Sequence, residues 1–158
     1  MVAVQHGNLD VIEVLLAARA NVNCTLPDGI FPLLAAILSG REDIASRLLK
    51  AKNINPSLFV DSGCSALILA IESDLEETAL ELIEKGADVM QKQKSDGYTA
   101  LHCAARIGAL PVVCRLLSSK RVTVDAAINS GDTALHIAVD RGMPSARSPA
   151  PSTPIRRP

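Results

Sequence analysis

Gly97-Tyr-Thr-Ala-Leu-His-Cys-Ala104 is the stretch that decides the fold, because closely related phrases occur at three further places in the chain. The other copies are Gly29-Ile-Phe-Pro-Leu-Leu-Ala-Ala36, Gly63-Cys-Ser-Ala-Leu-Ile-Leu-Ala70 and Gly131-Asp-Thr-Ala-Leu-His-Ile-Ala138. Each copy begins 34 residues after the preceding one, and a fixed period of this size predicts one supersecondary unit stacked on copies of itself. Such a stack presents a long surface rather than one enclosed pocket.

Each unit is predicted to contain two helices joined by a tight turn. Thr99 and Thr133 stand at the N-cap of the first helix, and Pro32 suits the first turn of the same helix because its missing N–H needs no partner. The predicted buried positions of the first helix are Leu33, Leu67, Leu101 and Leu135, with Ala36, Ala70, Ala104 and Ala138 three residues later. The second helix repeats its apolar residues at helical spacing as Ile12/Leu15/Leu16, Ala45/Leu48/Leu49, Ala79/Leu82/Ile83 and Val113/Leu116/Leu117. The predicted turn residues are Gly7, Gly40, Asp74 and Gly108.

These boundaries divide the chain into a repeat domain and a tail. The domain, residues 1–142, is predicted to hold a partial repeat 1–27, whole repeats 28–60, 61–94 and 95–128, and a partial repeat 129–142. No polar capping repeat is recognisable at either end. Residues 143–158 contain five of the nine prolines together with Ser, Thr and Arg, a composition that predicts a disordered tail.

The phrases Thr99-Ala-Leu-His-Cys-Ala104 and Thr133-Ala-Leu-His-Ile-Ala138 resemble the Thr-Pro-Leu-His-x-Ala signature of ankyrin repeats. The segment Gly86-Ala-Asp-Val89 and the turn at Gly108 strengthen the resemblance, which covers about residues 1–142. It implies an all-α ankyrin-repeat solenoid of stacked helix–turn–helix units with β-turn or hairpin loops. It also implies that one set of residues maintains the fold, namely Thr99, His102, Gly108, Thr133, His136 and Gly142.

Some residues differ from the usual ankyrin pattern, and a second repeat family has the same period. Leu34 and Ile68 replace the signature histidine, and Arg19 and Lys120 lie near helix exits where glycine is usual. Tetratricopeptide repeats share the 34-residue period, but they need an aromatic pattern that one Tyr, two Phe and no Trp do not supply. The ankyrin interpretation is therefore preferred.

Composition limits the classes of partner and the cellular location. The formal net charge is −1, aromatic residues make up 2% of the chain, and basic residues are scattered, so no nucleic-acid surface is predicted. The longest apolar run, residues 31–38, is much shorter than the roughly 18 residues of a membrane span, and no membrane insertion is expected. The four cysteines lack short pairings and are predicted to be free, mostly buried thiols of an intracellular protein, cytoplasmic or nuclear.

No catalytic apparatus, metal site or cofactor is predicted. His102 adjoins Cys103, but adjacent side chains on a helix point apart and do not form a nucleophilic pair. Eight acids lie between residues 61 and 90 against Lys85 alone. They are Asp61, Glu72, Asp74, Glu76, Glu77, Glu81, Glu84 and Asp88. This acidic band indicates either a solvated helix face or a surface that orients a partner with a basic patch.

The predicted function is the binding of another protein. The ankyrin resemblance implies a concave binding face made of the loop tips and the exposed side of the first helices. Matching positions give the candidate contact residues Ile30, Leu38, Glu72, Tyr98, Arg106, Ile107 and Asp132. Tyr98, Arg106 and Ile107 belong to one repeat and are predicted to cluster, and Tyr and Arg are enriched in interface hot spots.

Two alternatives accompany this prediction. The first alternative is that the chain is a regulatory or substrate-recruiting segment of a larger enzyme or channel, such as a ubiquitin ligase, kinase, acyltransferase or ion channel. The tail segment Pro151-Ser-Thr-Pro154-Ile-Arg156 also matches the pattern that a reader of Pro-rich motifs binds. Ser148-Pro149 and Thr153-Pro154 are candidate sites for proline-directed kinases.

Overall fold

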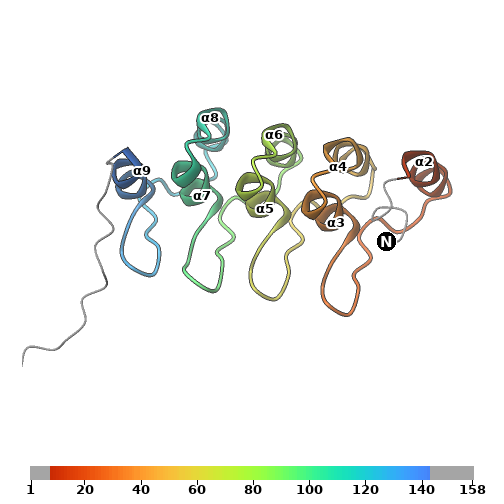
Figure 1. Ribbon diagram of the computed structural model, residues 1–158, viewed down its shortest axis with the longest axis horizontal. Helices are drawn as coiled ribbons and strands as arrows, with labels where there is room; N and C mark the ends of the chain where they lie inside the picture. Colours follow the sequence, from red (N-terminus) through yellow and green to blue (C-terminus); the bar gives the residue numbers. More distant parts are fainter. Residues whose placement is uncertain (1–7, 143–158) are drawn as a thin grey trace, which may run out of the picture.

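The computed structural model describes residues 8–142 of the chain, and this part contains eight helices arranged in two rows (Figure 1). The inner row consists of α3 (Pro32–Leu38), α5 (Ala66–Glu72), α7 (Ala100–Ile107) and α9 (Ala134–Gly142). The outer row consists of α2 (Leu9–Ala17), α4 (Glu42–Leu49), α6 (Glu76–Glu84) and α8 (Leu110–Ser118). Long loops leave the inner row on the side away from the outer row (Figure 1). The predicted all-α solenoid of stacked helix pairs is confirmed.

The inner helices begin where the repeated phrase predicts. Pro32 is the first residue of α3, and the Ser65 hydroxyl caps α5 by accepting a hydrogen bond from the N–H of Ile68 at 3.2 Å. Thr99 is the N-cap of α7, and α9 begins directly after Thr133. The caps at Ser65 and Thr99 satisfy backbone N–H groups that the first helical turn leaves without a partner, whereas Pro32 has no N–H to satisfy.

The core lies between the two rows and between successive repeats. Leu33 and Leu67 are fully buried and Leu101 is 4% exposed, as the repeat predicts. The alanines three residues later in α3, α5 and α7 are also fully buried, and their small side chains let neighbouring inner helices approach closely. Full burial of one leucine contributes about 1.5–3 kcal/mol. The stack is therefore held by aliphatic contacts that each repeat makes with the next.

The turns and helix exits require left-handed backbone at defined positions. Gly108 has φ 78° between α7 and α8, and Asp74 takes the same conformation with φ 58° between α5 and α6, as expected for a turn residue. Gly86 ends α6 with φ 89°. Arg19 and Lys120 occupy the corresponding exits with φ 59° and 54°. A side chain in this conformation costs roughly 1–2 kcal/mol relative to glycine, so these two exits are strained.

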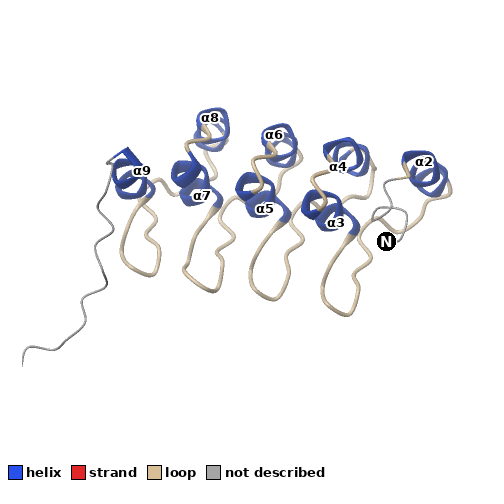
Figure 2. Cartoon of the chain, viewed as in Figure 1, coloured by secondary structure: helices blue, strands red, loops and turns tan. Residues whose placement is uncertain are grey.

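The loops between repeats are hairpin turns, and the last three of the described hairpins are hydrogen-bonded to one another through the backbone. Within residues 8–142 no continuous strand forms, and the bridges Phe59–Ser65 and Ala127–Thr133 stand alone (Figure 2). The N–H of Lys94 donates to the carbonyl of Ser62 at 2.9 Å, joining two successive hairpins. Gly63 has φ 81°, and a Cβ atom there would lie 2.5 Å from the carbonyl oxygen of Lys92. Glycine is therefore required where these hairpins meet.

The burial prediction is wrong at the two ends of the described stack. Leu135 is 73% exposed, whereas its counterpart Leu101 is 4% exposed. Ala138 is exposed as well, and Leu15 and Leu117 are 46% and 42% exposed. Among the described helices α9 packs chiefly on α7, and no outer helix of its own repeat is described, so side chains that are core residues in interior repeats face solvent there.

The cysteines correct a second expectation. All four are free thiols, as predicted, but only Cys103 is buried. Cys64 is half-buried, and Cys24 and Cys114 are exposed because one lies in a loop and the other on the outer side of α8. The tail at 143–158, with its Pro-rich motif and candidate phosphorylation sites, lies outside the described residues. In the part that is described, no helix is both long and apolar enough to cross a bilayer.

Candidate protein-binding surface

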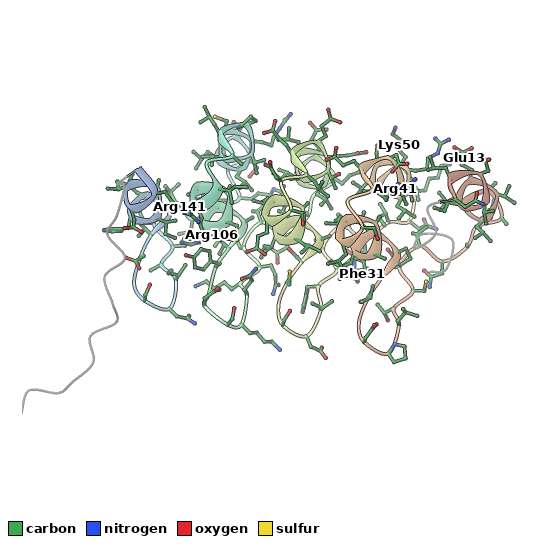
Figure 3. The ribbon with its side chains drawn as sticks, in the orientation of Figure 1. Glu13, Phe31, Arg41, Lys50, Arg106 and Arg141 are labelled. Carbon is green, nitrogen blue, oxygen red and sulfur yellow. The ribbon has the colours of Figure 1, made fainter. Side chains whose placement is uncertain are left out.

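The candidate contact residues all lie on hairpin loops or at the ends of inner helices. We call this side of the molecule the hairpin face; it comprises the hairpin loops and the adjoining C-terminal ends of α3, α5 and α7. Figure 3 shows Arg106 on the hairpin side of α7. Leu38, Glu72 and Ile107 end α3, α5 and α7 respectively. The repeat therefore places the predicted residues along one side of the stack.

Three of these residues form a contact cluster, which we call the Arg106 cluster: Glu72, Tyr98 and Arg106. The Arg106 Nη2 atom lies 2.9 Å from Glu72 Oε1, and this ion pair joins α7 to α5 of the preceding repeat. The Arg106 guanidinium carbon lies 5.7 Å from the centroid of the Tyr98 ring. Because both charged side chains are about a third exposed, at 33% and 29%, the pair contributes about 1 kcal/mol or less to stability. Its main effect is to fix the position of Arg106.

The Tyr98 ring is held from two sides. Asp96 Oδ1 accepts a hydrogen bond from the Tyr98 N–H at 3.0 Å, which fixes the backbone at the tip of the hairpin. The Tyr98 ring then meets the His102 ring edge-on, with centroids 5.9 Å apart and planes at 60°. Burial is the main reason that the pKa of Tyr98 is raised, so its hydroxyl stays protonated at neutral pH. The cluster thus presents a neutral phenol beside a cation.

His102 has a structural role in supporting this cluster. The ring is 1% exposed; Nδ1 accepts from the Thr99 N–H at 3.3 Å and lies 2.7 Å from the Thr99 hydroxyl. Nε2 lies 2.8 Å from the carbonyl of Ala126, so Nε2 carries the proton and donates to the next hairpin. Burial lowers the pKa of His102, which keeps the ring neutral. The arrangement is a capping box that also connects two repeats.

The same cap recurs in the last repeat without burial. Thr133 Oγ1 lies 2.9 Å from His136 Nδ1, and the Thr133 N–H donates to the same atom at 3.3 Å. His136, unlike His102, is exposed. Gly142 ends α9.

Cys103 lies behind the Arg106 cluster but is not a reactive thiol. Its Sγ atom is 3.8 Å from Glu72 Oε1, and burial raises the pKa of Cys103 to about 12. Because the thiolate is the nucleophilic form, a thiol with this pKa is inert at neutral pH. The expectation that His102 and Cys103 do not form a catalytic pair is consistent with this geometry, since the His102 ring nitrogens contact Thr99 and Ala126.

The remaining candidates lie apart from the Arg106 cluster. Ile107 follows Arg106 directly and is 39% exposed, and Leu38 is 57% exposed two repeats away. Ile30 was expected to be exposed, but it is half-buried and packs against the core. Asp132 is exposed on the last hairpin, where its Oδ2 accepts from the Ser130 hydroxyl at 2.6 Å.

Sequence reasoning missed one aromatic residue on this face. Phe59 is 54% exposed on the hairpin before α5, and Leu26 on the preceding hairpin is 36% exposed. The corresponding hairpin position in the last repeat is Ala127, as their matching bridges to Ser65 and Thr133 show. A large aromatic residue in a chain with only two Phe was the available signal.

Half of the acidic band lies away from the hairpin face. Four of its carboxylates belong to α6, which lies in the outer row, away from the hairpin loops (Figure 1). Among these, Glu84 pairs with Arg115 of α8 at 2.7 Å. Two members do reach the hairpin face: Glu72 is paired with Arg106, and Asp61 is exposed on the hairpin before α5. The four α6 carboxylates therefore lie on the back of the stack, away from these two acids.

Two adjoining hollows lie at the end of the described stack that contains α2. A hollow of about 720 Å³ lies between the ends of α2 and α4 and is lined by Leu16, Ala17, Arg19, Ala20, Asn21, Val22, Ala51, Lys52 and Asn53. This lining contains no carboxylate, imidazole or thiol that could act as a general acid, base or nucleophile. Over residues 8–142, no group of three His, Cys, Asp or Glu side chains is placed to hold a metal ion.

Comparison with known proteins decides the family. The family model described as "Ankyrin repeats (3 copies)" matches residues 1–93 and 89–147. The chain belongs to the ankyrin-repeat family. Proteins of this family generally mediate protein–protein interactions through their repeats, which agrees with the extended hairpin face.

Several curated ankyrin-containing proteins are similar to this chain. The nuclear factor NF-kappa-B p105 subunit of Gallus gallus is 33% identical over 143 residues, covering 89% of this chain and 14% of the relative. The tyrosine-protein kinase Shark of Drosophila melanogaster is 34% identical over 137 residues, covering 79% and 14%. The human transient receptor potential cation channel subfamily A member 1 is 26% identical over 147 residues, covering 89% and 13%. The chain thus spans only a small part of each of these relatives.

Proposed function

We propose that this ankyrin-repeat chain binds a partner protein through its hairpin face, with the Arg106 cluster as the anchor. The supporting observation is that Arg106 is held between Glu72 and Tyr98 while remaining partly exposed. A side chain that is already ordered loses less conformational entropy on binding. Arg and Tyr are also the residue types that most often contribute large shares of binding energy at interfaces.

Exposed apolar side chains extend this anchor along the hairpin face. Ile107 lies next to Arg106 in sequence and is 39% exposed, and Phe59 on a neighbouring hairpin is 54% exposed. Leu38 adds a further aliphatic contact at the end of α3 with 57% exposure. A row of apolar residues beside a cation fits an elongated polypeptide segment that carries both apolar and acidic residues.

The experiment compares partners captured by wild-type protein and by matched variants. Tyr98→Ala with Arg106→Ala removes the anchor, and Ile107→Asp places a charge at an exposed position beside it. Both variants should lose the captured partner, as identified by affinity purification and mass spectrometry, while circular dichroism shows unchanged helix content. The control, Glu77→Ala with Lys85→Ala, changes two exposed residues near α6 on the outer side. Equal capture by all four proteins would contradict the assignment.

A second candidate is that this repeat domain is a regulatory or recruiting segment of a larger enzyme or channel. The similar relatives include a protein named as a tyrosine-protein kinase and one named as a cation channel, and the chain covers 14% and 13% of them. Sequencing of the full-length transcript tests this candidate. An open reading frame that adds a kinase-like or membrane-spanning domain supports it, and one limited to these 158 residues opposes it.

We also propose an intracellular location, in the cytoplasm or nucleus. All four cysteines are free, and Cys24 and Cys114 expose their thiols. Free exposed thiols suit a reducing compartment, because oxidising compartments convert them to disulfides. A fluorescent fusion that is found in the secretory pathway would contradict this proposal.

A further inference from the structure

One position of the repeat, near the end of the inner helix, carries a different kind of side chain in each of three repeats. It is occupied by Leu38 in α3, Glu72 in α5 and Arg106 in α7, at a spacing of 34 residues. Glu72 is exposed although α3 and α7 both contact α5. Exposure is therefore a property of this position in an interior repeat, and the 57% exposure of Leu38 follows the same rule.

Arg106 keeps most of its hydrogen-bonding capacity. A guanidinium group has five N–H donors, and the hydrogen bond that Arg106 makes within residues 8–142 uses one of them, on Nη2, to reach Glu72. Nη2 has two hydrogens, one beside Nε and one beside Nη1. Whichever of the two Glu72 accepts, one pair of parallel donors stays complete, on Nε and Nη2 or on Nη1 and Nη2. Such a pair matches the two oxygens of a carboxylate.

The charges near the Arg106 cluster balance. Glu72, Asp96 and Asp132 are the acids, and Lys92, Lys94 and Arg106 are the bases. A phosphate would bring about two negative charges into these neutral surroundings. A carboxylate brings one, and its planar shape fits the parallel donors of a guanidinium group. A carboxylate is therefore the anion that this site favours.

The stack sets the distance between Leu38 and Arg106. In the inner row α3 packs on α5, and α5 packs on α7 (Figure 1). Packed helices have axes about 8–10 Å apart, so two repeats separate these side chains by about 16–20 Å. An extended chain advances about 3.3 Å per residue, so about five or six residues cover this distance.

The face between these two side chains is polar. Glu72 and Ser73 are exposed at the end of α5, and Asp61 and Ser62 are exposed on the hairpin before it. A helical partner needs a continuous apolar groove for its apolar stripe, which this middle part does not offer. An extended segment has peptide groups that need hydrogen-bonding partners, and polar side chains of this kind supply them. The middle repeat therefore favours an extended partner.

We propose that the hairpin face binds an extended peptide segment in which an aliphatic side chain and a carboxylate are about five or six residues apart. The carboxylate, from Asp or Glu, accepts two hydrogen bonds from the free pair of donors on Arg106. The aliphatic side chain covers Leu38. This inference rests on the proposed function, since it names the kind of segment that the hairpin face recognises.

Peptide display on the full chain tests the proposal. The library consists of random peptides of about 16 residues, a length that can contain an extended or a helical spacing between the two contacts. Peptides selected by wild-type protein should combine Asp or Glu with an aliphatic residue about five or six positions away. Leu38→Asp should lose the preference for the aliphatic residue. A selected spacing of about 11–13 residues, which a helix needs to cover the same distance, would overturn the proposal.

Two further variants test the role of Arg106. A selected peptide should bind Arg106→Gln at least about tenfold more weakly than wild type, and replacing the peptide's acidic residue by its amide should cause no further loss in that variant. Glu72→Arg with Arg106→Glu keeps opposite charges at the same two positions but moves the cation one repeat closer to Leu38. The spacing that this double variant selects should shorten to about three residues. An unchanged spacing, or continued selection of acidic residues by Arg106→Gln, would overturn the proposal.

The same selection distinguishes this inference from the proposed function. Peptides that fail to bind Tyr98→Ala with Arg106→Ala, but carry no acidic residue at the stated spacing, would contradict the inference alone. Peptides that bind this variant and Ile107→Asp as well as they bind wild type would contradict binding through the hairpin face. Glu77→Ala with Lys85→Ala is the control and should bind every selected peptide as wild type does. Circular dichroism checks that each variant folds.

Discussion

His102→Ala compared with His136→Ala isolates what burial adds to a repeated helix cap. Both histidines contact the preceding threonine through Nδ1, at 2.7 and 2.9 Å. His102 is 1% exposed and also donates to the Ala126 carbonyl at 2.8 Å, whereas His136 is exposed. The two substitutions therefore remove the same local contact in two different environments.

The expected losses follow from these contacts. Loss of a cap costs about 1 kcal/mol, and this is the whole effect expected for His136→Ala. His102→Ala also leaves the Ala126 carbonyl without its donor, which costs about 1–3 kcal/mol more. The free energy of unfolding should therefore fall by about 2–4 kcal/mol for His102→Ala. His102→Gln should recover part of the loss, since glutamine at this position completes a capping box.

Urea denaturation followed by tyrosine fluorescence measures the difference. Tyr98 is the single tyrosine, there is no tryptophan, and its ring lies beside His102. With a slope of about 1–3 kcal/mol per molar urea, the midpoint of His102→Ala should lie about 1–2 M below that of wild type. Equal midpoints for His102→Ala and His136→Ala would refute the reasoning, because burial and the bond to Ala126 would then contribute nothing.

Three further predictions concern pH, a hairpin glycine and the thiols. Burial lowers the pKa of His102 in the folded protein below its ordinary value of 6.5. Below pH 6.5 the unfolded chain therefore binds more protons than the folded chain. The free energy of unfolding should fall as the pH drops from 6.5 through the folded pKa, and this fall should be smaller in His102→Gln. Gly63→Ala should destabilise by more than Gly40→Ala, since both have positive φ but only Gly63 lacks room for a Cβ; thermal unfolding decides this. A thiol reagent should label exposed Cys24 in the native protein and buried Cys103 only after unfolding, and rapid native labelling of Cys103 would argue against its pKa of about 12.

The fold could be predicted from the sequence because the same repeated phrase marks where each helix begins and, through its period, which helices pack together. Thr99 and Pro32 mark helix starts by their own backbone chemistry, and the period then shows which faces meet. The same logic failed at Leu135, since a periodic pattern assigns burial by position and does not register whether a neighbour is present to cover it.

The candidate surface was predicted in outline only. The clustering of Tyr98 with Arg106 followed from their place in one repeat, but the ion pair to Glu72 joins residues 34 apart and depends on how two repeats are packed. Phe59 was missed because its exposure is set by the hairpin geometry rather than by helical periodicity. The position of the four α6 carboxylates on the outer row likewise needed the arrangement of the two rows.

Successive hairpins are joined by peptide groups, as the bonds from Lys94 to Ser62 and from Asn129 to Asp96 illustrate. Every residue except proline carries the same peptide N–H and C=O groups, whatever its side chain. The tips can therefore exchange their side chains during evolution while the distance from one loop to the next stays constant. A lineage can thus change what this protein recognises by single substitutions and retain the scaffold that displays them.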